Sequence, residues 1–167
     1  REGLVEELSA QRTGDPTQRG VKVGPLASES QLRDVRGGVE RLKGCAKAVH
    51  GDGSRGELTG IDHDKGYFMS PVLFEASDAR AEAVHAHEVF GPVATILPYS
   101  GDPAEAAELV GLGQGGLVAS IYSDDFDVAS GVALGMAPYS GRVNLGSAKV
   151  AEQSLGPGAV LPQLIHG

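Results

Sequence analysis

Short strand-like runs alternate with helix-length segments along most of this chain, and Gly, Pro or Asp residues mark the changes between them. The strand-like runs stand at 46–50, 67–75, 92–99, 117–122 and 142–145. Strands that alternate with helices of about a dozen residues are typical of α/β folds with a largely parallel sheet. A length of 167 residues suits one domain with one sizeable core. We therefore expect an α/β fold in which helices flank a largely parallel sheet.

The best-marked helix lies between residues 28 and 46. Ser28 and Gln31 have the spacing of a capping box, and apolar residues then recur at helical spacing. These apolar residues are Leu32, Val35, Val39, Leu42 and Ala46. Gly37 and Gly38 inside the helix each cost about 1 kcal/mol relative to alanine. We expect a neighbouring element to pack closely against this glycine pair.

Proline, glycine and capping residues predict the character of several other segments. The stretch 13–28 is rich in proline and glycine without a period, which predicts a long loop. Pro71 predicts that its strand lies at an edge or is kinked, and 78–86 predicts a short helical stretch. Ser123 or Asp124 is expected to cap a later helix. The residues expected on the inner side of that helix are Phe126, Ala129, Val132 and Ala133.

The chain is acidic, with a net charge of −8 from 22 acidic and 14 basic residues. Nucleic acids and anionic membranes attract basic surfaces, so we expect neither as a partner. No apolar run reaches the roughly 18 residues that a membrane span needs. A single cysteine, Cys45, cannot form an internal disulfide, which favours a reducing compartment such as the cytoplasm.

Both ends of the chain look cut. Residue 1 is Arg rather than Met, and Gly167 comes just after the apolar run 160–165. We expect the natural protein to continue in both directions, so that 1–167 is a single partial domain. The absence of a signal peptide at residue 1 then says little about location.

Cys45 is a candidate nucleophile, and the histidines are candidate metal ligands. Cys45 is predicted near the C-terminal end of a helix, where the helix dipole opposes a thiolate, so we interpret it as a structural thiol. His85 and His87 have no third ligand at a known zinc-site spacing, and we expect no metal. GLGQGG at 111–116 follows a helix and precedes a strand, the reverse of the order in a dinucleotide-binding fingerprint. It is therefore interpreted as a helix cap and turn.

The segment HEVFGPV at 87–93 combines an acid, an aromatic ring and a stiff Gly-Pro turn directly before a predicted strand. Two interpretations stay open from spacing alone. In one, Glu88 is a solvated acid and Phe90 belongs to the core. In the other, the turn holds a carboxylate and a ring towards a ligand. Ligands of α/β folds bind near the carboxyl ends of strands, which also directs attention to the loops after Tyr99, Tyr122 and Leu145.

Several motifs, in the same order along nearly the whole chain, resemble those of the NAD(P)-dependent aldehyde dehydrogenases. E-x-F-G-P-V, at 88–93, is a signature of that family. GDP at 14–16, together with VGPL at 23–26, resembles the segment that follows the family's nucleophile. GYFMSPVLF at 66–74 and GRVNLGS at 141–147 resemble two further family motifs, the second in a shortened or shifted form. The resemblance implies the fold of the C-terminal part of the family's catalytic domain.

The tail 154–167 departs from the family's usual P-F-G-G ending. It resembles the PaaZ-like branch, whose members act on coenzyme A-linked semialdehydes in aromatic-acid breakdown, including that of phenylacetate. HAHEVFGPVATILP, from His85, also resembles this branch. The resemblance implies a CoA-linked semialdehyde as the substrate. It implies NAD or NADP as the cofactor, with NADP favoured by the branch.

The resemblance also implies roles for individual residues. In the family a cysteine attacks the aldehyde, hydride passes to the nicotinamide, and water activated by a glutamate hydrolyses the thioester. Glu88 would bind the nicotinamide ribose, whose paired hydroxyls suit a carboxylate, and Phe90 would pack beside the nicotinamide. Asn144 and Ser147, expected on the loop after the last strand, would line the substrate tunnel. His166 falls near the position of the aromatic residue in P-F-G-G and would also line it.

Segments that 1–167 lacks are implied in the same way. The family's nucleophilic cysteine, activating glutamate and cofactor domain lie upstream of the matching segment, and its last strand lies downstream. Cys45 matches no cysteine motif of the family, so we expect no catalytic residue in this segment and no activity from it alone. The full protein is expected to be a homo-oligomer. The alternative is a non-catalytic, aldehyde-dehydrogenase-like module used for binding or assembly.

Overall fold

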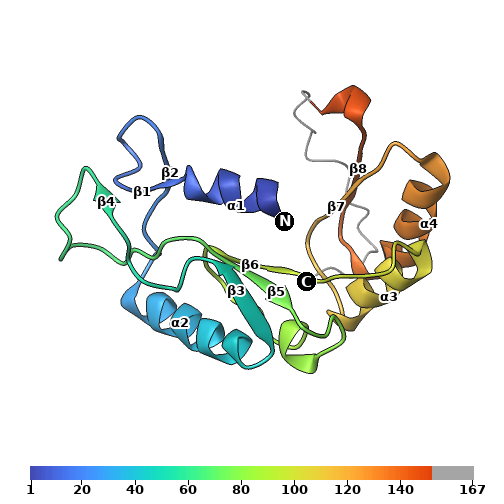
Figure 1. The fold of residues 1–167 in the computed structure, drawn as a ribbon, viewed down its shortest axis with the longest axis horizontal. Helices are drawn as coiled ribbons and strands as arrows, with labels where there is room; N and C mark the ends of the chain where they lie inside the picture. Colours follow the sequence, from blue (N-terminus) through green and yellow to red (C-terminus); the bar gives the residue numbers. More distant parts are fainter. Residues whose placement is uncertain (152–167) are drawn as a thin grey trace. The chain divides into compact units, whose positions relative to one another are not determined.

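The computed structural model describes residues 1–151, which form two compact units, 1–98 and 99–151 (Figure 1). The elements of the first unit are α1 (Glu2–Ser9), β1 (Arg12–Gly14), β2 (Val21–Val23), α2 (Glu29–Lys43), β3 (Ala46–His50), β4 (Leu58–Thr59), β5 (Val72–Ala76) and β6 (Val93–Ile96). Those of the second unit are α3 (Pro103–Leu112), β7 (Ala119–Tyr122), α4 (Phe126–Met136) and β8 (Val143–Gly146). None of the helices within 1–151 is long and apolar enough to cross a membrane.

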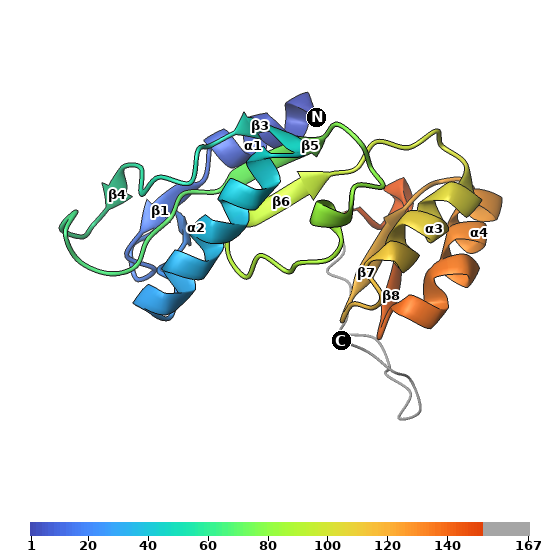
Figure 2. The ribbon, with the colours of Figure 1, turned by 90° about the horizontal axis from the view of Figure 1, so that it is seen from below.

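Within residues 1–151 the strands form three small sheets in which parallel pairing dominates. In the first unit β5 lies between β3, which is antiparallel to it, and β6, which is parallel. Helices α1 and α2 lie on opposite faces of this sheet (Figures 1 and 2). A second sheet has β1 between β2 and β4, again in parallel. In the second unit β7 and β8 pair in parallel beside α3 and α4. The predicted α/β fold with a largely parallel sheet is confirmed.

The main core of the first unit forms where α2 packs against the sheet. Its buried residues are Leu32, Val35, Val39, Leu42, Ala46, Met69, Val72 and Phe74. Phe74, in the central strand β5, is 0% exposed. The apolar face of α2 is the one that the helical spacing predicts, but Ala46 is the first residue of β3 because the helix ends at Lys43 with Gly44 as its cap. Ser28 caps α2 as predicted, since its side chain accepts a hydrogen bond from the Gln31 N–H at 3.1 Å.

The close neighbour expected at the glycine pair is present at Gly38. A Cβ atom at Gly38 would lie 2.7 Å from Cγ2 of Val89, far inside van der Waals contact. A Cβ atom at Gly37 would meet only the end of the Arg41 side chain, at 3.7 Å. Gly38 therefore lets the segment around Val89 approach the helix, whereas a methyl group at Gly37 would make only an ordinary van der Waals contact.

Three expectations for the first unit are wrong in detail. The segment 13–28 is not only loop, because β1 continues to Gly14 and β2 follows. Strands of two or three residues are too short to show a period, and β1 depends on pairing with β4 far along the chain. Of the two alternatives for Pro71, the edge strand is wrong, because β5 is central; β5 begins only after Pro71, at a position where no ladder N–H is required. The segment 78–86 forms only a single 3₁₀ turn, at Glu82–Val84.

The cap of α4 differs from the prediction by one or two residues. Asp125 is the N-cap, and its side chain accepts hydrogen bonds from the N–H groups of Asp127 and Val128 at 2.9 and 3.1 Å. Ser123 instead accepts a hydrogen bond from the Asp125 N–H at 3.1 Å. Phe126 is then the first helical residue and is 79% exposed, not part of the inner face. Ala129 and Val132 are buried as expected, and Ala133 is partly buried.

Candidate functional site

The HEVFGPV segment forms a tight turn that enters β6. The Gly91 N–H donates to the Val89 carbonyl at 2.9 Å, and the Val93 N–H donates to the Gly91 carbonyl at 2.7 Å. The Pro92 carbonyl accepts from the Val72 N–H at 2.9 Å, which ties the turn to the central strand β5. Consecutive short hydrogen bonds of this kind leave the backbone little freedom. These three hydrogen bonds define the shape of the turn and anchor it to the sheet.

Glu88 and Phe90 are both exposed on this turn. Phe90 is 71% exposed, so the interpretation that places its ring in the core is wrong. Glu88 and Phe90 line a hollow of about 350 Å³ together with Gln31, Val89 and Gly91. Within residues 1–151 the Glu88 carboxylate has no hydrogen-bond or ion-pair partner, so both of its oxygens can accept from a ligand. A free carboxylate beside an exposed ring suits a group that carries paired hydroxyls next to a flat face.

Gln31 is a member of this hollow that was identified from the sequence only as a cap. Its side-chain Nε2 donates to the Phe90 carbonyl at 2.8 Å, and its Oε1 accepts from the Ala27 N–H at 2.9 Å. A capping box would direct the Gln31 side chain to the Ser28 N–H, and the structure instead places its Oε1 on the Ala27 N–H, one residue earlier. Nothing in the spacing points to Phe90, because the two residues are 59 positions apart.

The second unit has a smaller hollow at the carboxyl ends of β7 and β8. Its volume is about 220 Å³, and Ser120, Tyr122, Asn144, Gly146, Ser147, Val150 and Ala151 line it. The structure thus brings Asn144 and Ser147 to one site. Asn144, however, lies within β8 rather than on the loop after it, because parallel pairing with β7 continues to Gly146. Ser147 directly follows the strand. His166 lies outside the described residues.

Tyr122 is a residue of this hollow that the sequence analysis did not select. It is the last residue of β7 and is 74% exposed. A Cβ atom at Gly146 would lie 2.5 Å from the Tyr122 ring, so the ring covers this glycine. Its position at the carboxyl end of a predicted strand is the sequence feature that could have identified Tyr122 as a site residue, because ligands of parallel sheets bind there.

Cys45 lies in the apolar surroundings expected of a structural thiol. It follows the C-terminal cap of α2 and packs against the main core. Its Sγ donates to the Leu42 carbonyl at 3.5 Å. This places Cys45 at the helix end where the dipole disfavours a thiolate.

Further candidates have structural roles in the described residues. His85 contacts the Ala79 carbonyl through Nε2 at 2.6 Å. Residues 1–151 contain no group of three or more His, Cys, Asp or Glu side chains arranged to hold a metal ion. The GLGQGG segment contains the end of α3 and its cap, Gly113, as predicted; Gln114 next to the cap has a positive φ of 60°.

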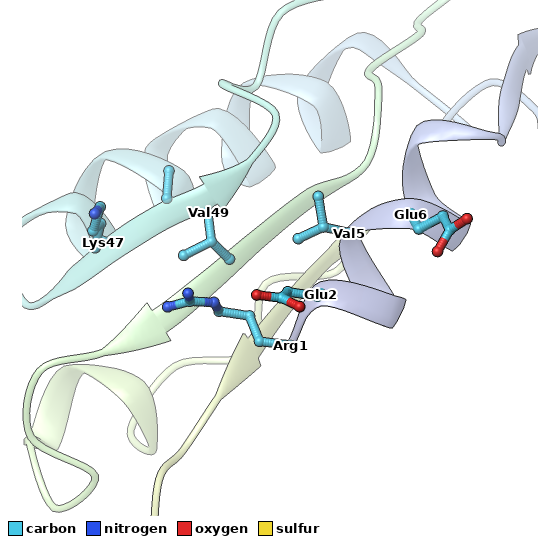
Figure 3. Close-up of a pocket in the computed structure, with 7 residues that line it drawn as sticks. Arg1, Glu2, Val5, Glu6, Lys47 and Val49 are labelled. Atoms are coloured by element: carbon cyan, nitrogen blue, oxygen red, sulfur yellow. The ribbon is translucent and has the colours of Figure 1, made fainter.

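A roomier hollow in the first unit lies between α1 and β3 (Figure 3). Its volume is about 510 Å³, and it is lined by Arg1, Glu2, Val5, Glu6, Lys47, Ala48 and Val49. Arg1 forms an ion pair with Glu75 at 2.9 Å, and this pair raises the pKa of the Arg1 guanidinium. The lining carries two basic and two acidic side chains and includes none of the residues around Glu88. Volume alone therefore does not locate the candidate site.

Comparison with known proteins shows that the chain belongs to the aldehyde dehydrogenase family, whose profile matches residues 1–157. It is 35% identical over 162 residues to 3,4-dehydroadipyl-CoA semialdehyde dehydrogenase of Aromatoleum evansii, covering 96% of this chain and 31% of that protein. It is 34% identical over 148 residues to Protein MaoC of Klebsiella aerogenes, covering 87% of this chain and 42% of that protein. The NAD⁺ complex structure of aldehyde dehydrogenase from Bacillus cereus is similar with a TM-score of 0.75 at 25% identity, covering 95% of this chain and 29% of that one.

The resemblance inferred from the motifs is thereby confirmed at the level of the family. Two of these three relatives are aldehyde or semialdehyde dehydrogenases by name, and one of the two names a CoA semialdehyde. The chain spans less than half the length of each of these three relatives.

Proposed function

We propose that this chain forms the nicotinamide-binding and substrate-lining part of an NAD(P)-dependent aldehyde dehydrogenase. The substrate class we propose is a CoA-linked semialdehyde, oxidised to the carboxylic acid. The observation that carries the proposal is the exposed pair Glu88 and Phe90 on one rigid turn, at a hollow of about 350 Å³. The similarity to a CoA semialdehyde dehydrogenase supports the substrate class, and the similarity to an enzyme solved with NAD⁺ supports the cofactor.

The residues of the turn fit a nicotinamide ribose. We call residues 88–92 the clamp turn. The Glu88 carboxylate offers two acceptor oxygens to the paired ribose hydroxyls, and Phe90 offers an exposed apolar face beside them. The bound cofactor would supply the hydride acceptor. The role of the clamp turn is to orient that acceptor, because reacting atoms must be held at near-contact distance for efficient transfer.

The hollow of the second unit is proposed to line the substrate path. Asn144 offers amide donors and an acceptor, and Ser147 offers a hydroxyl, close to the exposed Tyr122 ring. These groups can bind a carbonyl or thioester oxygen without contributing a nucleophile. We keep NADP as the favoured cofactor, on the resemblance of the tail to its branch. An oligomer in the cytoplasm is proposed from the family resemblance.

The chain is proposed to contribute binding rather than bond-breaking chemistry. Its single cysteine, Cys45, packs against the core and lies at the C-terminal end of a helix. A thiol nucleophile requires the opposite surroundings, with a helix N-terminus or a cation nearby. We therefore propose that a cysteine outside 1–167 attacks the aldehyde, and that 1–167 alone oxidises nothing.

Cys45→Ser is expected to leave dehydrogenase turnover of the complete protein within about twofold of the parent. Serine keeps the size of the side chain but removes the thiol, so a nucleophilic role would be abolished. The measurement is steady-state aldehyde oxidation followed by cofactor reduction, with unfolding by denaturant as a check on folding. A loss above about a hundredfold in a folded variant would mean that Cys45 is the nucleophile.

The experiment that tests the proposed function is cofactor binding by Phe90→Ala in the complete protein. The affinity for NAD(P)⁺ is expected to fall about threefold to tenfold, because aromatic contacts of this kind contribute modestly. The affinity for ADP, which lacks the nicotinamide ribose, should stay unchanged. Calorimetry or fluorescence titration measures both affinities.

Phe126→Ala is the matched control for this experiment. Phe126 is also a highly exposed phenylalanine, at 79%, but it lies at the start of α4 and lines neither hollow. Its loss should change neither affinity. If Phe90→Ala weakens ADP and NAD(P)⁺ equally, or weakens neither, the assignment of Phe90 to the nicotinamide end is wrong.

A further inference from the structure

We propose that one face of α2, made by Gln31, Val35 and Gly38, positions the clamp turn, and that Gln31 and Gly38 are positioning residues of the nicotinamide site. This inference rests on the proposed function. It adds residues that act through the turn rather than through contact with the ligand. It also assigns a function to Gly38, one of the two adjacent glycines in α2, whose presence secondary structure alone leaves unexplained.

The three helix residues share one face and meet the turn in succession. Residues four and three positions apart on a helix lie on the same side, so 31, 35 and 38 form a continuous stripe. Gln31 bonds the Phe90 carbonyl at 2.8 Å. Val35 lies under Gly91, and Gly38 lies under Val89. The stripe therefore contacts the consecutive turn residues 89–91 and sets the position of their backbone.

The two glycine contacts are reciprocal. A Cβ atom at Gly91 would lie 2.7 Å from Cγ2 of Val35, and one at Gly38 would lie 2.7 Å from Cγ2 of Val89. Each element thus places a valine over a glycine of the other. Valine is stiff at χ1, so neither side chain can swing away without leaving its preferred rotamer. A methyl group added at either glycine must move the turn relative to the helix.

The Gln31 side chain adds a directional bond to this packing. Its Oε1 accepts from the Ala27 N–H at 2.9 Å, and its Nε2 donates to the Phe90 carbonyl. Reversing the amide would set a donor against a donor and an acceptor against an acceptor, so its two partners determine its orientation. The first turn of α2 and the backbone that carries the Phe90 ring are therefore linked through one rigid amide.

Gly38→Ala tests this inference against its neighbour Gly37→Ala. In the complete protein, Gly38→Ala is expected to lower the affinity for NAD(P)⁺ about tenfold, because overpacking displaces the turn. The affinity for ADP should not change. Gly37→Ala adds the same methyl group to the same helix where the nearest atom is 3.7 Å away, and both affinities should be retained. Adding Val89→Ala to Gly38→Ala removes both close Cγ atoms and should restore binding.

Hydrogen exchange of the complete protein supplies a readout that does not depend on activity. Gly38→Ala should speed exchange at the Gly91 and Val93 amides, whose hydrogen bonds shape the turn, and Gly37→Ala should not. A purely structural role for Gly38 would instead speed exchange across α2 and β5 without singling out the turn. That result, with NAD(P)⁺ affinity retained, would overturn the inference.

Gln31→Met provides a second, independent variant, with Ser28→Ala as its control. Methionine keeps the length of the side chain but loses both hydrogen bonds, so NAD(P)⁺ affinity should fall about fivefold. Ser28→Ala weakens the same helix terminus without touching Phe90 and should not alter that affinity. If Gln31→Met and Ser28→Ala lowered the NAD(P)⁺ affinity equally, Gln31 would act only by capping the helix, and the inference would be wrong.

Glu88→Gln separates failure of this inference from failure of the proposed function. If Glu88→Gln weakens NAD(P)⁺ binding but Gly38→Ala and Gln31→Met do not, the positioning role is wrong and the clamp stands. If none of the three alters binding although Gly38→Ala loosens the turn, the turn is not a nicotinamide clamp, and both proposals fall.

Discussion

Glu88→Gln is expected to slow hydride transfer in the complete protein about tenfold to a hundredfold, the range for losing charge-assisted hydrogen bonds. The amide keeps the shape of the side chain, but it has one acceptor oxygen where the carboxylate has two. One of the two ribose hydroxyls then loses its acceptor and the nicotinamide end is less firmly oriented. Stability should stay unchanged, because Glu88 is exposed and makes no bond within the described residues.

Single-turnover kinetics and a cofactor titration measure the effect of Glu88→Gln. Hydride transfer is followed in the first turnover, so that product release does not hide it. Glu82→Gln is the control, because Glu82 is also exposed, lies six residues earlier on the preceding 3₁₀ turn and does not line the hollow. An unchanged first-turnover rate together with unchanged NAD(P)⁺ affinity would refute the role assigned to Glu88.

Phe74→Ala is expected to destabilise the first unit by about 3–5 kcal/mol, as truncation of a fully buried aromatic residue leaves a cavity. Phe74 is 0% exposed in the central strand β5, where it joins the core formed with α2. The same strand carries the Val72 N–H that holds the Pro92 carbonyl. Loss of this core therefore removes the support of the clamp turn as well.

Denaturant unfolding of the 1–167 chain measures this loss, with Phe126→Ala as the exposed counterpart. Replacing Phe126 should change stability by less than about 0.5 kcal/mol, as is usual for surface positions. Phe74→Leu should lie between the two, because leucine fills part of the space. A loss below about 1 kcal/mol for Phe74→Ala would show that the sheet is not held by this core.

Much of the fold could be predicted because its signals are local. The cap at Ser28 and the apolar stripe of α2 depend on residues within a few positions of one another, and both occur in the structure. The strands β1, β2 and β4 could not be predicted, because each has only two or three residues, and because β1 and β4 pair far apart along the chain. Phe126 was misplaced because the cap lies at Asp125, which makes Phe126 the first helical residue, and its side chain is exposed there while Ala129 and Val132 are buried as expected.

For the candidate site, too, one part could be predicted from the sequence and another part could not. The motif at 88–93 identified the family, and with it Glu88 and Phe90, because a family signature is a property of contiguous residues. Spacing alone left open whether Phe90 was buried. Tertiary structure decided this, since the hydrogen bond between Gly91 and Val89 and the contact with α2 leave the Phe90 ring exposed.

The sequence by itself determined the family, the α/β class and the chemical groups at residues 88 and 90. Only the tertiary structure decided that Gln31 reaches Phe90 and that Gly38 lies under Val89, across more than fifty positions of chain. The physical reason is that local patterns report which face of an element is apolar. They do not report which distant backbone packs on that face, because a contact at 2.8 Å depends on the packing of the whole core.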